Sequence, residues 1–580
     1  MIMAGTLFIP ALVVVVSVII RLAYLRLLPK PIPGIPCNKD SATRLLGDAH
    51  YFTELEKAGG FWSDFFTDLL SKHNTPIAQF FPGPFEGAGV VIGDYREARD
   101  LMTKRSKDLG RGYTNNVSWR GVLPEHFIAM DSFHPSFKDA HFLTKDLMTP
   151  SFLHGVSAPA SHKTVLNFIE LWKAKAAMAH GSPFDAAEDL EGFTYDIMMT
   201  SAFGIAEQDS HTLDRLRIVQ EAEKAEFKDN SSFHFAEFPH VEKPELLTAL
   251  VILNGRVSNA LQSTTPKISL ALNKLRPSVR QAFRSKSRII QSHIDRSVEK
   301  LSRGGSKEEL HSAVDYVVSR EKSAAESAGR RPVFDSLRIN DMLWGYMVGG
   351  QDSTHSTLCF AVKYLTANPD AQSKLRRALR LAYPEADEQD RQPTLKEILK
   401  TQVHFLDAFI EETLRVCSPA GAVAKEALCD MSVSGHIIPK GTPIIFMLNG
   451  PTINMAGAEV EEIKRSGLSH KVSSEGFDDW SQSPFPPGEF HPERWLQADE
   501  TGNVKFESTA GPSLTFSTGP RGCWGKRLAY MELKLIVTLL VWDLVFMGLP
   551  AEMEDNGLVE GLFTKPKSCF VKLQSNTGKT

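Results

Sequence analysis

Apolar residues recur at intervals of three and four along most of the chain, which is the spacing of one face of an α-helix. The pattern is clearest over residues 152–175, 193–203, 341–365 and 525–546. Residues 77–93 and 434–448 instead carry short apolar runs separated by Pro and Gly turns, which predict β-strands. We therefore expect a mainly α fold with a small β region.

Two stretches, residues 301–332 and 457–487, are mostly polar with scattered Gly and Ser, and we expect them to form surface connections. The sequence contains no internal repeat and no low-complexity tract that would mark a second domain boundary. One large catalytic domain over residues 40–580 is therefore expected.

The first 28 residues predict a transmembrane helix. Residues 1–20 carry no charged side chain, and the run PALVVVVSVII continues with further apolar residues up to Leu28. That length crosses about 30 Å of hydrocarbon. A cleaved signal peptide is the alternative, but it needs a basic residue before the run and a small-residue cleavage site after it. Arg21, Arg26 and Lys30 follow the run instead, so we expect a single-pass anchor in membrane lipid with the body in the cytosol. Residues 29–39 form a proline-rich linker, predicted to be a stiff spacer.

The composition is that of an ordinary globular protein. Hydrophobic residues make up 42%, charged residues 23%, and the formal net charge is −4, so no basic excess indicates a nucleic-acid partner. Six cysteines lie far apart, without the spacing of a disulfide framework or a structural zinc site. A reducing compartment is the simplest interpretation.

One cysteine has unusual neighbours, in the segment FSTGPRGCWG. The segment predicts a loop that delivers Cys523 to the start of a helix, where free backbone N–H groups and the helix dipole stabilise a thiolate, the form that ligates iron. A buried cysteine is more often a small core residue. Here, however, Gly519 and Gly525 leave room for a flat macrocycle, Arg521 offers donors to a haem propionate, and Phe516 would shield the sulfur.

This segment resembles the haem-binding pattern of the cytochrome P-450 superfamily, Phe-x-x-Gly-x-Arg-x-Cys-x-Gly. Its five fixed positions match Phe516, Gly519, Arg521, Cys523 and Gly525. In that family the cysteine thiolate is the proximal iron ligand of haem b and favours O–O cleavage. The resemblance implies the cytochrome P-450 fold, preceded here by the predicted anchor, and makes Cys523 the metal ligand.

The family's Glu-x-x-Arg motif matches Glu412 and Arg415, and its later Pro-Glu-Arg segment places Arg494 in FHPERW. A Glu–Arg pair three residues apart on a helix is usually a solvated surface pair worth about 0.2–0.5 kcal/mol. In the family these residues form a Glu–Arg–Arg network. We assign Glu412, Arg415 and Arg494 to structure.

The segment GGQDST places two glycines inside a predicted helix, at a cost of about 1 kcal/mol each relative to alanine. A frayed helix with an exposed acid is the plainer interpretation. Otherwise Gly349 and Gly350 mark a close approach of another segment or a distortion of the helix. The hydroxyls of Ser353 and Thr354 could then bond the carbonyls of these glycines. The resemblance makes this the oxygen-side helix, with Asp352, Ser353 and Thr354 as catalytic proton-relay residues. Ser353 replaces the family's usual threonine but keeps the hydroxyl.

Before Pro150, the family commonly places Trp-x-x-x-Arg to hold a propionate. His141 and Lys145 occupy those positions, and both can donate hydrogen bonds, although two exposed polar residues are an equally good interpretation. The resemblance also implies substrate-facing positions, which are mainly apolar and predict a lipophilic substrate: Trp344, Met347, Val348, Gly349, Ala422, Leu562 and Phe563.

The activity implied by the resemblance is monooxygenation, in which one oxygen atom from O₂ enters a small molecule. No Gly-x-Gly-x-x-Gly dinucleotide fingerprint occurs, so NADPH electrons are expected through a separate FAD/FMN reductase at the endoplasmic reticulum membrane. The sequence looks most like fungal enzymes of specialised metabolism.

Two alternatives remain open. A haem-thiolate isomerase or dehydratase would use the same cysteine without a reductase, and a haem sensor would perform no reaction. The acid and hydroxyl of Asp352 and Ser353 are superfluous in both, which favours the monooxygenase.

Overall fold

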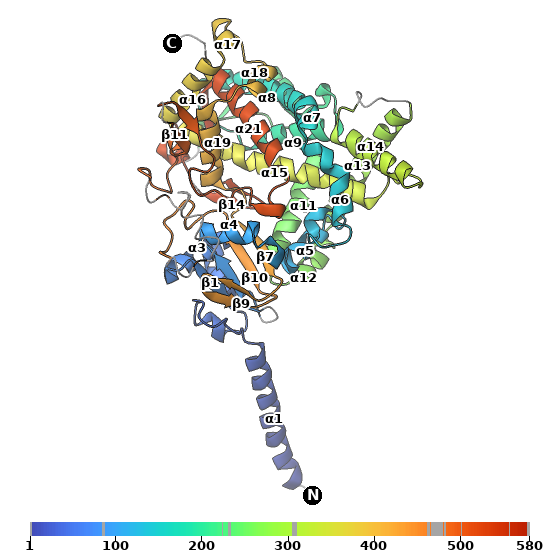
Figure 1. Cartoon of the computed structure of the whole chain (residues 1–580), viewed down its shortest axis with the longest axis vertical. Helices are drawn as coiled ribbons and strands as arrows, with labels where there is room; N and C mark the ends of the chain where they lie inside the picture. Colours follow the sequence, from blue (N-terminus) through green and yellow to red (C-terminus); the bar gives the residue numbers. More distant parts are fainter. Residues whose placement is uncertain are drawn as a thin grey trace. The chain divides into compact units, whose positions relative to one another are not determined.

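The computed structural model describes residues 3–83, 87–222, 224–229, 234–303, 310–460, 465, 480, 483–499, 502–555 and 557–576 (Figure 1). The chain divides into two compact units, Met1–Gly112 with Ala422–Asp478, and Tyr113–Gly421 with Asp479–Thr580. Helices predominate and the sheets are small, which confirms the predicted fold class. Most of the polar stretch 457–487 lies outside the described residues.

The first unit is built on a five-stranded sheet. Its order is β1 (Ile77–Phe80), β2 (Gly89–Ile92), β10 (Pro443–Met447), β7 (Ala422–Ala427) and β3 (Leu109–Gly110). β10 runs parallel to β2, and the other neighbours are antiparallel. The remaining elements are α2 (Ala49–Lys57), α3 (Trp62–His73), α4 (Tyr95–Thr103), β8 (Met431–Val433) and β9 (His436–Ile438). The strands predicted from residues 77–93 and 434–448 are confirmed.

The N-terminal helix α1 (Met3–Leu27) leads into the proline-rich segment (Figure 1). From Leu12 onward its large apolar side chains are mostly exposed. Within the part of the chain that the structure describes, no helix has the length and hydropathy of a membrane span.

The proline-rich segment is attached to the sheet rather than free. Gln79 on edge strand β1 accepts a hydrogen bond from the Ile32 amide at 2.7 Å and donates to the carbonyls of Ile32 and Ile35, at 3.0 and 2.6 Å. Ile32 and Ile35 are buried. These hydrogen bonds between the proline-rich segment and Gln79 satisfy polar groups beside a sheet edge that would otherwise be open.

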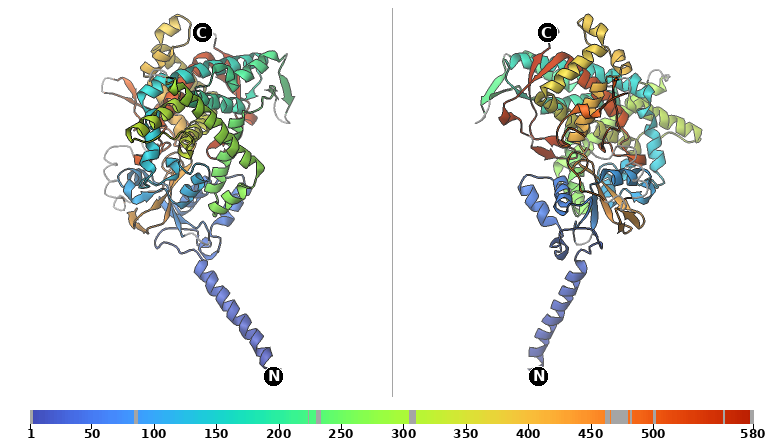
Figure 2. Two further views of the ribbon diagram at one scale, coloured as in Figure 1. Left: turned by 90° about the vertical axis from the view of Figure 1, so that its right-hand side faces the viewer. Right: turned by 60° about the vertical axis from the view of Figure 1, so that its left-hand side comes forward.

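The second unit contains most of the helices (Figure 2). They are α5 (Tyr113–Arg120), α6 (Phe137–Thr144), α7 (Pro150–Phe152), α8 (Ala158–Met178), α9 (Ala187–Phe203), α10 (His211–Glu221), α11 (Glu245–Leu261), α12 (Pro266–Asn273), α13 (Pro277–Ser302), α14 (Ala313–Ser327), α15 (Leu337–Ala367), α16 (Pro369–Ala382), α17 (Pro384–Glu388), α18 (Leu395–Lys400), α19 (His404–Cys417) and α21 (Lys526–Asp543). Its short strands are β4 (Phe184–Asp185), β5 (Glu226–Asp229), β6 (His234–Glu237), β11 (Leu496–Ala498), β12 (Val504–Phe506), β13 (Leu544–Met547), β14 (Leu558–Glu560), β15 (Thr564–Pro566) and β16 (Phe570–Ser575).

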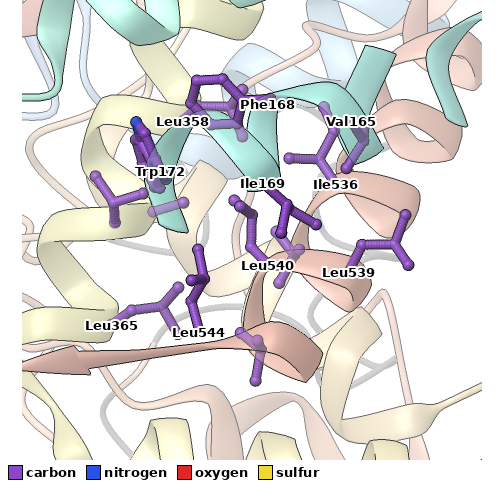
Figure 3. Close-up of a cluster of buried hydrophobic side chains, with 14 of the residues drawn as sticks. Val165, Phe168, Ile169, Trp172, Leu358, Leu365, Ile536, Leu539, Leu540 and Leu544 are labelled. Atoms are coloured by element: carbon purple, nitrogen blue, oxygen red, sulfur yellow. The ribbon is translucent and has the colours of Figure 1, made fainter. Parts of the chain in front are cut away.

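The core of this unit lies where α8, α15 and α21 meet. Phe168 and Trp172 of α8, Leu358 of α15 and Ile536 and Leu540 of α21 belong to one buried cluster (Figure 3). Because α15 and α21 carry the predicted oxygen-side and cysteine-side residues, this apolar packing fixes the two helices on which the site depends.

Two predictions about secondary structure were wrong. Within residues 301–332, expected to be a surface connection, α14 forms because Val314, Val317 and Val318 bury one face of it. The polar majority of the segment concealed this sparse apolar spacing. The predicted helix 525–546 ends at Asp543, because Leu544–Met547 instead pairs with β16 as strand β13.

The paired glycines of α15 have different surroundings. A Cβ at Gly350 would lie 2.2 Å from Sδ of Met198 on α9, whereas a Cβ at Gly349 would meet no atom within 4 Å. Met198 is fully buried, so it has little room to move. The close approach of α9 and α15 therefore explains Gly350 but not Gly349.

We predict that Gly350→Ala lowers the free energy of unfolding by about 1–3 kcal/mol, because the added methyl overpacks the α9–α15 contact. Gly349→Ala is the matched control and should be neutral or stabilising by up to about 1 kcal/mol through helix propensity. Denaturation midpoints of the two variants measure this. Equal midpoints would contradict the packing argument.

Candidate active site

The cysteine segment forms a tight loop directly before α21. The amide of Cys523 donates to the carbonyl of Phe516 at 2.8 Å, which closes the loop. Ser517 and Gly519 adopt positive φ angles of 52° and 74°, the region that favours glycine. The loop therefore presents the Cys523 side chain, which is exposed, one turn ahead of the helix.

Opposing effects act on the Cys523 thiol. Desolvation by the surrounding protein raises the pKa of this thiol; the backbone N–H groups of Gly525 and Lys526 and the Lys526 charge lower it, but by less. The predicted helix-end stabilisation is therefore present but does not dominate. Binding of a metal cation removes the proton of such a thiol. At Gly525, a Cβ would lie 3.9 Å from the sulfur, so glycine keeps this side of it uncrowded.

Arg521 is half-buried and closes this loop's 3-10 turn. Its Nη2 donates to the carbonyls of Phe127 and Met130, both at 3.1 Å, and its guanidinium stands 4.5 Å from the centre of the Phe137 ring. Burial lowers the pKa of Arg521 to about 10, so it stays a cation at neutral pH. Asp131 is the carboxylate whose charge acts on Arg521, but among the described residues no carboxylate forms an ion pair with it. A half-buried cation of this kind favours an anion.

His141 and Lys145 occupy different surroundings. The His141 ring lies 5.9 Å from the Trp524 ring, and burial together with the Arg521 charge lowers the pKa of His141. The structure thus brings His141 to the cysteine segment. The ammonium of Lys145 instead lies 4.5 Å from the centre of the Phe142 ring. Phe516 packs against Tyr530, with ring centroids 5.1 Å apart.

Glu412 is the centre of a fully buried polar network. Arg415 donates to its carboxylate from Nε and Nη2, both at 2.8 Å, and Arg494 donates from Nε at 2.8 Å. Trp495 Nε1 and the amide of His491 complete the set at 2.9 and 2.8 Å. The structure brings together the three predicted network residues, and removing one partner of such a pair typically costs about 3–5 kcal/mol.

On α15, the hydroxyl of Ser353 donates to the carbonyl of Gly349 at 2.7 Å. Asp352 is buried, and its carboxylate accepts from Asn254 Nδ2 at 3.2 Å and pairs with Lys565 Nζ at 2.6 Å. Thr354 is buried. Sequence reasoning missed Asn254 and Lys565, because they lie 98 and 213 residues away from Asp352 and neither belongs to a recognisable motif.

The expected substrate-facing residues fall into three groups. Trp344, Met347 and Val348 are buried in an apolar cluster, against which the half-buried Leu562 packs. Gly349 borders open space, and Phe563 lies on the turn between β14 and β15. Ala422 begins β7 in the first unit.

A separate cavity of about 730 Å³, between α6, α14 and the chain before α15, contains none of the predicted site residues.

Glu532 is a buried acid that sequence reasoning did not single out. It lies on α21, nine residues after Cys523, and its Oε1 has no hydrogen-bond partner among the described residues. Burial raises its pKa to about 8. Its position on the apolar face of an amphipathic helix was the available signal.

Comparison with known proteins agrees with this arrangement. The family model for cytochrome P450 matches residues 63–452 and 485–572. The chain is 30% identical over 573 residues to cytochrome P450 monooxygenase TRI13 of Fusarium sporotrichioides, covering 95% of this chain and 96% of that protein. A cytochrome P450 monooxygenase of Pestalotiopsis microspora is 32% identical, with the same coverage, and monooxygenase xilC of Penicillium rubens is 30% identical over 95% of this chain and 94% of its own length.

A mainly helical protein that presents a cysteine at the start of a buried helix, with a buried acid and a hydroxyl on a second helix, is built like a haem-thiolate enzyme. The chain belongs to the cytochrome P450 family. It is a haem-dependent monooxygenase, with haem b bound through a cysteine thiolate and electrons supplied from NADPH by a reductase.

The raised pKa of Glu532 makes stability depend on pH. Between its ordinary value of 4.5 and about 8, the folded protein keeps a proton that the unfolded chain has lost, so the folded state loses stability as pH rises through this interval. We predict that Glu532→Gln becomes progressively more stable than the parent from pH 5 to pH 8. Thermal midpoints across this range measure the difference, with the exposed Glu552→Gln as control. A difference independent of pH would contradict the assignment.

Proposed function

We propose that this protein inserts one oxygen atom from O₂ into a lipophilic small molecule during the biosynthesis of a fungal specialised metabolite. The observation that carries the proposal is the presentation of Cys523 by a closed loop at the start of α21, with the half-buried, cationic Arg521 beside it and no side chain at Gly525. The similarity of this chain to fungal monooxygenases along nearly its whole length supports the proposed biological setting.

The residues of the cysteine segment fit haem. Cys523 would be the iron ligand, Phe516 and Gly519 would shape the loop around it, and Arg521 and His141 would donate to the propionates. Lys145 is proposed for the same role, through movement of its flexible side chain away from Phe142. When bound, haem supplies the activation of O₂ at a thiolate-ligated iron.

The proposed role of the α15 residues is proton delivery. Asp352 is a buried carboxylate, and Ser353 and Thr354, which carry hydroxyls, follow it directly in the sequence. Ser353 donates its proton to the Gly349 carbonyl, which leaves its oxygen free to accept a proton from a neighbour. Ser353 would therefore deliver protons at the position where the family usually has threonine.

The substrate is proposed to be lipophilic. Trp344, Met347, Val348 and Leu562 are apolar and belong to one cluster, and Gly349 borders open space beside it. Phe563 is proposed to complete the apolar lining. Such a site excludes water and binds an apolar ligand through buried surface.

The partner and the location follow the same reasoning. We propose an NADPH–cytochrome reductase with FAD and FMN as the electron donor, because the chain contains no dinucleotide fingerprint. We also propose that residues 1–28 anchor the protein in the endoplasmic reticulum membrane. Support comes from the uncharged run 1–20 followed by Arg21, Arg26 and Lys30, which favours a cytosolic body.

The test of function is product analysis. Cells expressing the protein with a reductase are fed lipophilic metabolites, and mass spectrometry should detect a product heavier by one oxygen that incorporates label from ¹⁸O₂. Asp352→Asn should lower product formation by about 100-fold or more, because a general acid is removed while the cysteine remains. Turnover without NADPH would favour the isomerase or dehydratase, and haem binding without turnover of any metabolite would favour the sensor.

The test of location is protease accessibility in microsomes. Protease added to intact vesicles should digest the body beyond Pro36, since the charges after residue 20 hold it on the cytosolic side. A variant lacking residues 1–28 should no longer sediment with the membranes. Full protection of the body in intact vesicles would place it in the lumen and contradict the proposal.

A further inference from the structure

Asp352 is held from two sides by residues distant in sequence. Lys565 contacts one carboxylate oxygen, Oδ1, and Asn254 of α11 donates to the other, Oδ2. The Asp352 side chain is 10% exposed and the Lys565 side chain 27%. With both oxygens engaged, the carboxylate has a fixed orientation in an interior where an unpaired charge is costly.

Lys565 is itself fixed by the hairpin that carries it. β14 and β15 are antiparallel partners, with Leu558 opposite Pro566 and Glu560 opposite Thr564. Ser258 of α11 donates to the carbonyl of Gly561 at 2.8 Å, Ser356 of α15 donates to the carbonyl of Thr564, and the Thr564 amide donates to the carbonyl of Pro419 at 2.8 Å. The hairpin is therefore attached to both α11 and α15.

Among the residues that the structure describes, Asp352 is the one carboxylate that forms an ion pair with Lys565. Glu191, the next carboxylate that influences it, forms its own ion pair with Lys243 at 2.5 Å. Burial alone would lower the pKa of Lys565, but Asp352, and to a smaller extent Glu191 and Cys359, hold the pKa of that ammonium above its usual range. Lys565 therefore remains a cation facing Asp352.

We propose that Lys565 is a positioning residue for proton delivery: its ion pair, together with the Asn254 hydrogen bond, holds the Asp352 carboxylate in the orientation from which it serves the hydroxyl of Ser353. This inference rests on the proton-delivery role proposed above for Asp352. It explains why a half-buried cation lies on a hairpin whose turn carries the apolar residues Leu562 and Phe563.

The existence of the pair is tested by a double-mutant cycle on the haem-loaded full chain. Lys565→Gln and Asp352→Asn should each lower the melting temperature, and the double variant should lose clearly less than the sum of the two single losses, because each change removes the same interaction. Lys567→Gln is the matched control: it lies two residues away on the same segment, is exposed, and should melt like the parent. Additive losses of melting temperature would contradict the existence of the ion pair.

Its role is tested by the peroxide released per NADPH consumed, measured with purified reductase and no added substrate. Lys565→Gln should raise this ratio severalfold, to the level of Asp352→Asn, and the double variant should go no further. Lys565→Arg, which keeps the charge, should restore the parent's ratio, an outcome that a general packing role would not produce.

A Lys565→Gln protein with the parent's ratio would overturn the positioning role. So would a double variant with a ratio well beyond that of both single variants. Failure here is distinguishable from failure of the proposed function, because the haem spectrum and the formation of oxygenated product report on the latter in the unmodified protein.

Discussion

The structure depends on one constraint above others: a charge inside the helical unit has to be paired there. Glu412 shows the consequence most fully, since its carboxylate accepts from two arginines, a tryptophan and a backbone amide, and joins α19 to the segment around Arg494. Asp189, paired with Lys175 and Arg215, follows the same rule on α9. Buried pairs of this kind add little net stability, but losing one partner is expensive, so they fix which segments lie together.

The same constraint acts on three further groups, Asp352, Arg521 and Glu532, of which one has an ion-pair partner and two do not. Asp352 is paired with Lys565. Arg521 donates its hydrogen bonds to carbonyls and a hydroxyl and has no ion-pair partner among the described residues, and Glu532 avoids the cost by keeping its proton. A half-buried cation without an ion-pair partner close to Cys523 suits a site that receives an anionic cofactor, whereas Glu532, neutral when protonated, is compatible with apolar packing.

Much of this was predictable from local sequence pattern. The helical periodicity located α8, α9 and α15, and the spacing of Phe516, Gly519, Arg521, Cys523 and Gly525 identified the cysteine segment. Non-local facts were not predictable. Met198 explains Gly350, and Lys565 explains how Asp352 is held, but neither pair has a signal in the intervening sequence. The helix α14 was missed because three valines are enough to bury it, and the strand β13 was missed because its partner lies near residue 575.

The central claim is that Cys523 holds the haem iron as a thiolate. Its most direct test is the absorption spectrum of the reduced, carbon-monoxide-bound protein, compared between the parent and Cys523→Ala, with Cys417→Ala as a control for loss of a buried cysteine elsewhere. The parent and the control should both show the red-shifted Soret band of thiolate-ligated haem, and Cys523→Ala should lack it. A parent-like band in Cys523→Ala would contradict the account.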